Sequence, residues 1–272
     1  MNPKLTFIFI LLISVNMSYA QESILNHKFI YNLTYQSDST NINSKQSEKM
    51  LLFTGNDGSI FQSYNGFVRD SMLLELKNNP EKQNSSLSNI SSFPKTQFSF
   101  KIIKTFNHDS LIVFEKIFID NFRYDESKEN IKWEIKSDTM TINGFESQKA
   151  TTFYAGRKYE AWFSSEIPIS DGPYKFSGLP GLIIKISDVE NHYVFELIEK
   201  VNISMTYPSL KTKDKLFITD KSTFFKKLKE FKNNIFERAS QAGFTVDEEY
   251  KQQIKVKLNK KNNPIELNDN DQ

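Results

Sequence analysis

Apolar and polar residues alternate along most of this chain, and this period of two limits the fold more than any other feature. Phe29, Tyr31, Leu33 and Tyr35 alternate with residues such as Asn32, as in a strand with one buried face. Similar alternation returns in later stretches, at 98–102, 111–119, 131–135, 139–142, 145–154, 158–163, 182–187 and 192–201. Antiparallel sheets commonly bury one face and leave the other in water. The pattern therefore predicts a mainly β protein.

Short segments rich in Gly, Asn and Asp separate these strands and predict tight turns. Thr54–Ser59 lies between two apolar runs, and its Gly and Asn residues accept the positive φ that a hairpin requires. Comparable turns are expected at 107–110, 143–144, 155–156 and 188–191. We expect His108 to lie in solvent within its turn, and His192 to have a pairing or packing role at the start of its strand. Residues 78–97 are mostly Asn, Ser, Lys and Pro, which predicts a loop.

The spacing of apolar residues changes from two to between three and four in the last quarter of the chain, which predicts two helices. The first has apolar residues at 224, 225, 228, 231 and 235, and Thr219, Asp220 or Ser222 could cap its start. The second follows Gly243, begins with a capping box formed by Thr245 and Glu248, and has apolar residues at 246, 250, 254 and 258. Acidic residues are interspersed among the lysines, which favours helices packed on a sheet over helices on a membrane surface.

These patterns together predict the fold class as mainly β (α+β). The expected architecture is a curved antiparallel sheet or half-barrel with C-terminal helices packed against it. Helices are expected largely within residues 219–260. No internal repeat of roughly 20–50 residues is present, which argues against solenoids and propellers. We expect a single domain over residues 21–272.

The first twenty residues have the pattern of a cleavable signal peptide. A positive start at Lys4 precedes the mostly apolar run Leu5–Val15, and Ser18-Tyr19-Ala20 places small residues where a signal peptidase needs them. The run is shorter than the roughly 18 apolar residues of a membrane span. We expect cleavage between Ala20 and Gln21, no transmembrane segment afterwards, and a periplasmic or secreted protein. No Cys follows the apolar run, so a bacterial lipid anchor is not expected.

The composition excludes several classes of function. The chain has no Cys and three His, so disulfides, thiol chemistry, thiolate zinc sites and histidine-rich metal clusters are not expected. The net charge of +2 gives no electrostatic reason to expect nucleic acid as a partner. No pattern points to a cofactor.

The most unusual local composition runs from Ala161 to Asp188, where Pro and Gly are concentrated. Pro restricts φ and Gly permits positive φ, so this segment predicts a rigid, irregular crossover between two strands. The Gly178–Gly181 turn could cradle a phosphate through its backbone amides, but no P-loop Lys-Ser/Thr follows it. We therefore predict a structural turn that packs Leu179 into the core.

At this segment the chain resembles the GLPGLI family, a group of exported Bacteroidetes proteins. Gly178-Leu179-Pro180-Gly181-Leu182-Ile183 is similar to the hexapeptide that gives the family its name. Residues 156–162, 166–169 and 172–176 also resemble the family's core, and 31–39 and 263–267 resemble its two ends. Members often carry a Cys near Ser147, which this chain lacks. The family has no known function, so the resemblance implies a location and a fold but no reaction. The motif residues, with a structural or a binding role, are Trp162, Glu166, Pro168, Gly172, Pro173, Gly178, Leu179, Pro180, Gly181, Leu182 and Ile183.

Residue chemistry leaves the activity open. Ser164, Ser165 and Ser177 are available nucleophiles, but no G-x-S-x-G elbow is present and no His is paired with them by the pattern. Glu166, Asp171 and Asp188 could hold a hard cation, although their spacing is not that of a known site, and no catalytic or metal residue is assigned. The rich aromatic content favours a non-enzymatic exported protein that binds or carries an apolar ligand, or that serves as an accessory to an outer-membrane complex. The expected partner is therefore an apolar ligand or an envelope protein, and the alternative is a secreted hydrolase with an unrecognised site.

Overall fold

The computed structural model describes residues 24–79, 92–206, 215–241, 243 and 245–267. The signal peptide predicted at residues 1–20, with its cleavage before Gln21, lies outside the described residues. The same holds for 80–91 in the predicted loop 78–97.

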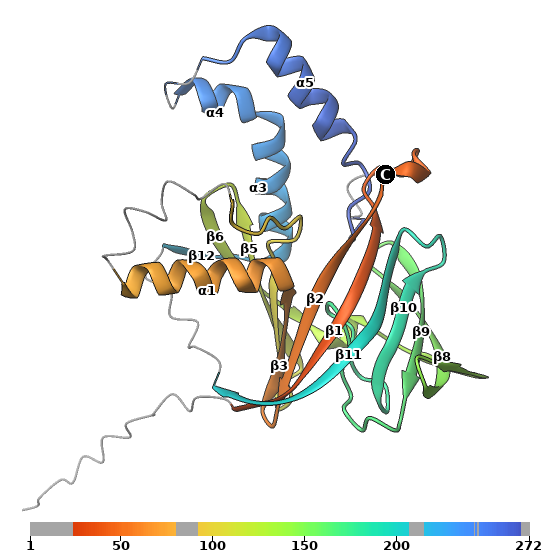
Figure 1. The fold of residues 1–272 in the computed structure, drawn as a ribbon. Coiled ribbons are helices and arrows are strands. Elements are labelled where there is room, and N and C mark those ends of the chain that lie inside the picture. The colour runs from red at the N-terminus through yellow and green to blue at the C-terminus, as the bar shows by residue number, and fades with distance from the viewer. Residues whose placement is uncertain (1–23, 80–91, 207–214, 242, 244, 268–272) are drawn as a thin grey trace, which may run out of the picture.

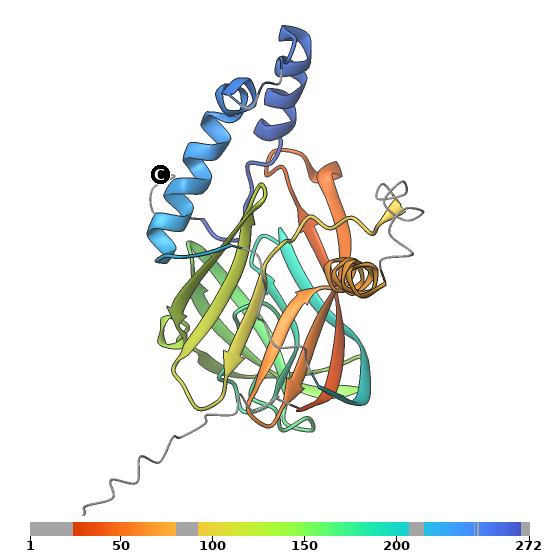
Figure 2. The same cartoon turned by 90° about the vertical axis from the view of Figure 1, so that its left-hand side faces the viewer.

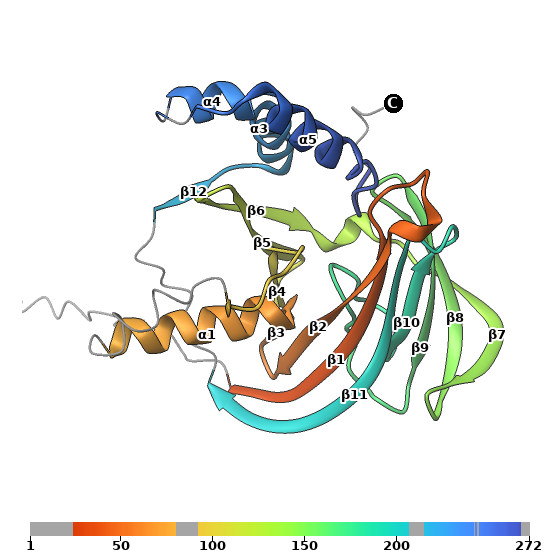
Figure 3. The same ribbon diagram turned by 45° about the horizontal axis from the view of Figure 1, so that its top comes forward.

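One curved sheet of twelve strands is the largest part of the described chain (Figure 1). The strands are β1 (Ile24–Gln36), β2 (Lys45–Gly55), β3 (Gly58–Ser63), β4 (Lys101–Thr105), β5 (Ser110–Ile117), β6 (Asp120–Ser127), β7 (Glu134–Ile142), β8 (Phe145–Tyr154), β9 (Arg157–Ser164), β10 (Leu182–Asp188), β11 (Tyr193–Thr206) and β12 (Leu216–Ile218). Their order is β12-β6-β5-β4-β3-β2-β1-β11-β10-β9-β8-β7. All neighbours are antiparallel except β12, which runs parallel to β6. Figure 3 shows how strongly the sheet bends, and the predicted fold class is confirmed.

β1, a strand of 13 residues with alternating apolar side chains, lies near the middle of the sheet. It pairs with β2 on one side and β11 on the other, and Tyr31 lies opposite both Met50 and Leu197. The alternating residues Phe29, Tyr31 and Leu33 are fully buried on the concave face. This agrees with the half-buried strand that the sequence predicts.

The convex face carries a second, smaller core that α1 (Tyr64–Asn78) covers. Leu25, Ile30, Leu51, Phe53 and Ile60 form this cluster. Phe67 of α1 packs against Phe53 with ring centroids 5.3 Å apart. Figure 2 shows α1 end-on beside the sheet. The sheet is therefore packed on both faces.

The helix α1 corrects the expectation that helices lie largely within 219–260. It is capped by Ser63, whose side chain accepts a hydrogen bond from the amide of Gly66, and none of its residues is fully buried. Because its apolar residues do not gather on one stripe, the helical period is not visible in the sequence. Two strands, β6 and β12, were also not predicted. The chain turns into β6 at Phe118, which takes a φ of 58° that only a few non-glycine residues adopt.

The C-terminal helices are α3 (Lys221–Asn233), α4 (Ile235–Gln241) and α5 (Glu248–Asn259). α3 begins at the cap Asp220 and buries Phe224 against Tyr124 of β6, with ring centroids 5.3 Å apart. α4 and α5 bury no residue and rise beyond the end of the sheet (Figure 1). Gly243 separates them, as predicted, with a φ of +82°. The second cap is Asp247 rather than the Thr245–Glu248 capping box.

No helix in the described ranges is long and apolar enough to cross a membrane. Short 3₁₀ turns at Ile42–Ser44 and Lys128–Asn130 complete the regular structure. His108 lies exposed in the turn between β4 and β5, as the sequence predicts.

Candidate functional site

The crossover, residues 165–181 between β9 and β10, packs onto the concave face of the sheet. Ile167, Tyr174, Phe176 and Leu179 are all buried in the main core. Phe176 packs against the edge of Tyr159 with ring centroids 4.7 Å apart. The concave side is thus filled by the chain's own aromatic side chains.

Lys104 of β4 attaches the crossover to the sheet. Its Nζ lies 2.5 Å from Asp171 Oδ1 and donates to the carbonyl oxygens of Gly172, at 2.7 Å, and Phe176, at 3.3 Å. Burial lowers the pKa of Lys104, and the Asp171 carboxylate opposes this shift. An ammonium group has three donors, and these three acceptors use them all.

A second lysine, Lys175 of the crossover, lies in a separate buried network of charged side chains. Its Nζ contacts Glu126 Oε2 at 2.7 Å and Glu266 Oε1 at 2.5 Å, and Lys221 contacts the same two carboxylates. The Tyr174 hydroxyl also donates to Glu266 Oε1. Burial would raise the pKa of Glu266, but Lys175 and Lys221 outweigh it and lower the pKa from 4.5 to about 2.

Glu266 belongs to the C-terminal segment Asn263–Leu267, which Arg157 of β9 binds. The Arg157 guanidinium donates to the Asn263 side chain, to the carbonyl oxygens of Pro264 and Ile265, and to Asp188 Oδ2 at 2.9 Å. The Tyr193 hydroxyl donates to the Asn263 carbonyl at 2.6 Å. The segment is therefore a built-in part of the core rather than a loose tail.

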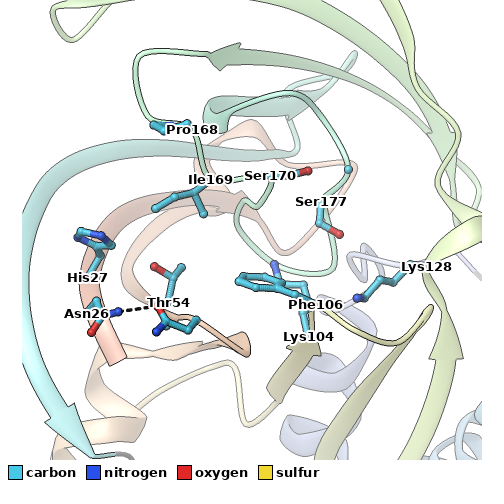
Figure 4. Close-up of a pocket in the computed structure, with 13 residues that line it drawn as sticks. Asn26, His27, Thr54, Lys104, Phe106, Lys128, Pro168, Ile169, Ser170 and Ser177 are labelled. Carbon is cyan, nitrogen blue, oxygen red and sulfur yellow. Dashed lines mark hydrogen bonds between the residues drawn. The ribbon is translucent and has the colours of Figure 1, made fainter. Parts of the chain in front are cut away.

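A cleft of about 500 Å³, which we call the crossover cleft, lies between the crossover and the ends of the strands (Figure 4). One wall comes from the sheet, with Asn26 and His27 of β1, Thr54 of β2, Phe106 after β4 and Lys128 after β6. Its volume falls within the range of small-molecule sites, roughly 300–1,000 Å³.

The crossover supplies the opposite wall of this cleft. Pro168, Ile169, Ser170, Ser177 and Gly178 all line it, and two of them, Pro168 and Gly178, are motif residues predicted from the sequence. The lining thus combines apolar side chains with hydroxyls and amides, as sites that bind and orient small molecules do.

Four residues lie side by side across four strands, and we call them the polar row; three of them, His27, Thr54 and Lys104, line the cleft. The register places His27 opposite Thr54, Thr54 opposite Ser59, and Ser59 opposite Lys104. Opposed residues point to the same face of a sheet. That face is the concave one, because residues two positions away on these strands belong to the main core, namely Phe29, Leu52, Phe61 and Ile102. Within the described part of the chain, Thr54 Oγ1 and Ser59 Oγ are buried without a hydrogen-bond partner.

The remaining motif residues take different positions. Gly172, Pro173, Leu179, Gly181, Leu182 and Ile183 are buried. Trp162 is half-buried on β9, with Lys149 Nζ 5.8 Å from its ring centroid. Glu166 is exposed and accepts a hydrogen bond from the amide of Glu146 at 2.8 Å. Pro180 lines a second cleft of about 550 Å³ beside β7 and β8, where Ser165 also lies. The motif therefore contributes to two clefts and to the core between them.

The three acids considered as cation ligands are not brought together. Glu166 bonds to a backbone amide, Asp171 pairs with Lys104, and Asp188 pairs with Arg157. Asp188 does lie close to Glu190 and His192, with ligand atoms within 4.8 Å of one another. The Arg157 guanidinium on Asp188 works against a cation at this position.

The serines considered as nucleophiles are also separated. Ser164 is buried, Ser165 is exposed in the second cleft, and Ser177 lines the crossover cleft. Within the described ranges, no histidine hydrogen-bonds to any of the three. The His27 ring bonds to Asn202 at 3.0 Å instead.

The sequence did not single out Lys104, Lys128, His27 or Thr54. Of these four residues, only Lys104 could have been found from the sequence pattern. It is a charged residue at a position where the alternation of Phe100 and Ile102 predicts a side chain facing the core. A lysine in such a position needs a buried partner. The identity of that partner, Asp171, follows only from the fold.

The fold and the clefts define a curved β-sheet protein whose concave side is closed by its own crossover. The model of a family described as "Protein of unknown function (Porph_ging)" matches residues 154–185, from the end of β8 to the start of β10. No curated protein matches the chain. Two crystal structures of PNGF-II, in different crystal forms, resemble it with a TM-score of 0.53 and with 11% and 12% identity. The likeness covers 76% of this chain and 33% of theirs, so the chain spans about a third of their length. At this identity the likeness shows the fold alone.

Proposed function

We propose that the chain is an exported, non-enzymatic binding or carrier protein of the GLPGLI family, periplasmic or secreted after removal of residues 1–20. The signal-like start, the motif and the match of a family model over 154–185 support this proposal. The aromatic residues pack mainly on one another, so we place the ligand in the crossover cleft and not in the concave core.

The observation that carries the proposal is the construction of this cleft. Ile169 and Phe106 provide apolar contact on opposite walls, and Asn26, Ser170 and Ser177 provide polar groups around them. The buried pair Lys104–Asp171 holds one wall to the other. A cleft with rigid walls needs little rearrangement to bind, which lowers the cost of holding a ligand.

The test is native mass spectrometry of the full chain purified from the periplasmic fraction of a host. We expect a bound small molecule that is released on denaturation. Ser170→Trp should abolish it by filling the crossover cleft, while Ser165→Trp, the matched change in the second cleft, should retain it. The reverse result would move the site to the second cleft, and a product instead of an intact ligand would favour the alternative of a secreted hydrolase.

A second candidate function is an accessory role in an outer-membrane complex. Phe118, Ile119 and Ile218 are each about three-quarters exposed near the β12 edge of the sheet. Exposed apolar groups of this kind are common at protein interfaces. This function is tested by replacing Phe118 with a photo-crosslinking residue. The control carries the same residue at the exposed position of Phe153, away from the β12 edge. A specific envelope protein that is crosslinked from position 118 but not from position 153 would favour the accessory function.

A further inference from the structure

We infer that the crossover cleft binds an uncharged compound that combines an apolar face with several hydroxyl groups. This rests on the proposed binding function and names the chemical class of its ligand. Three features of the cleft carry it, namely its lysines that already bind groups of the protein, the unpartnered hydroxyl at its floor and the apolar groups at its mouth.

The two lysines that line the cleft already bind groups of the protein itself. Lys104 gives all three donors to Asp171, Gly172 and Phe176, so it has none left for a ligand. Lys128 donates to the carbonyl oxygens of Thr105 and His108. The negative charges of Asp171 and Asp109 act on it. A cation entering the cleft would approach the two lysines that line it, and the buried Asp171 carboxylate behind Lys104 weakens the attraction of Lys104 for an anion. An uncharged ligand avoids both disadvantages.

The floor of the cleft offers a hydroxyl that has no partner. Thr54 is 1% exposed, and its Oγ1 is without a hydrogen bond in the described chain. Figure 4 shows Thr54 between His27 on one side and Phe106 on the other. A buried polar group left unpaired costs about 1–3 kcal/mol. A ligand hydroxyl that bonds to Thr54 Oγ1 after a rotation of this one side chain recovers part of that cost, whereas a hydrocarbon does not.

The mouth of the cleft suits the apolar face of the same ligand. Phe106 is 43% exposed and stands opposite Ile169 of the crossover. Asn26, Ser170 and Ser177 surround this apolar contact with groups that both donate and accept. Such groups match hydroxyls at the edge of a ring or chain and have no charge to pair with an ion.

The first test holds the tail of the probe constant and changes only its head group. Octyl glucoside, octanoate and octyltrimethylammonium, each below its micelle concentration, are titrated into the full chain by calorimetry. The neutral glucoside should bind roughly tenfold or more tightly than either ion, because it alone pairs with neutral hydroxyls and amides. Tighter binding of octanoate would overturn the inference.

The second test changes the floor with a matched control. Thr54→Val keeps the shape and removes the hydroxyl, and it should weaken octyl glucoside binding roughly tenfold while leaving octanoate unchanged. Ser59→Ala removes the neighbouring unpartnered hydroxyl, which does not line the cleft, and should change neither affinity. Equal effects of both variants, or no effect of Thr54→Val, would show that Thr54 is a core residue only.

The two tests separate this inference from the function on which it rests. If an ion binds best and its binding is lost in Ser170→Trp, the cleft is a binding site with a different ligand class. If no probe binds and none shifts the NMR signals of the His27 ring, the crossover cleft is not the site, and both proposals fail.

Discussion

Gly178 and Gly181 bracket the turn of the motif, and the backbone requires them for different reasons. Both have φ values in the region that favours glycine, +96° and +150°. A Cβ on Gly181 would lie 2.2 Å from the carbonyl oxygen of Ser164, whereas a Cβ on Gly178 would only touch the Trp133 ring at 3.9 Å. Strain alone therefore acts at Gly178, and strain plus a backbone clash acts at Gly181.

We expect Gly178→Val to destabilise the protein by about 1–3 kcal/mol and Gly181→Val by more. Thermal melts of both variants, with exposed Pro180→Ala as the control, show which substitution lowers the melting temperature more. A purely binding role for the turn predicts unchanged melting temperatures with lost ligand, and that result would overturn the structural interpretation.

Glu115 of β5 is a partly buried acid near the Lys175 network. Burial raises the pKa of Glu115 from 4.5 to about 7, with Glu266 adding to the shift and Lys175 and Lys232 opposing it. The folded protein therefore binds this proton more tightly than the unfolded chain does. The resulting stability is present below pH 4.5 and is lost as the pH rises through 7.

Glu115→Gln should accordingly stabilise the protein at and above neutral pH by about 1–3 kcal/mol. It should also flatten the fall in stability between pH 4.5 and 7. Urea unfolding across this range measures both effects, with exposed Glu129→Gln as the control. An unchanged pH profile would mean that Glu115 reaches water.

At the scale of elements, strands were predictable where apolar alternation is long, as in β1 and β8, and where Gly marks the hairpin, as at Asn143-Gly144. The helix α1 was not predictable, because Phe67 alone of its residues packs on the convex-face core and its apolar residues form no stripe. The strand β12 was not predictable either, because its three residues are too few to show the alternation of apolar and polar residues that is typical of a strand.

The candidate site was predictable only in part, for a related reason. The Pro and Gly residues of the crossover predict its irregular structure, but the sheet wall opposite it is assembled from residues far apart in the chain. His27, Thr54, Ser59 and Lys104 become neighbours only through strand register. A hairpin turn predicts that β2 pairs with β3, but no turn signal predicts the pairing of β3 with β4, because α1 and a long stretch of sequence lie between them in the chain.

The C-terminal segment Asn263–Leu267 is an element whose attachment depends on one side chain. The planar Arg157 fork reaches Asn263, Pro264 and Ile265 together, and a lysine has a single point of contact. We expect Arg157→Lys to lower stability by roughly 2–4 kcal/mol and to expose the segment to proteases. Thermal melts and limited proteolysis check this, with Arg123→Lys, an exposed pair with Asp125, as the control. Equal resistance of both variants would contradict it.

On the scale of the whole molecule, stability should be unevenly distributed. α4 and α5 bury no residue, while β1 is buried between two strands. We expect amides of 235–241 and 248–259 to exchange with solvent far faster than those of β1 and β11, because local opening there breaks few contacts. Hydrogen exchange followed by mass spectrometry measures this, and comparable protection would mean that the helices pack on another surface.

Contacts between residues far apart in sequence have a consequence for how the chain acquires its structure. The Tyr31 hydroxyl donates to the carbonyl oxygen of Ile183, 152 residues later, and Glu266 completes the Lys175 network near the end of the chain. Contacts so distant in sequence form late and slowly, because a long loop has to close first. A newly made chain therefore stays unfolded until almost all of it has been synthesised. That delay would suit the export that we propose, because an exported chain crosses the membrane as an extended thread before it folds.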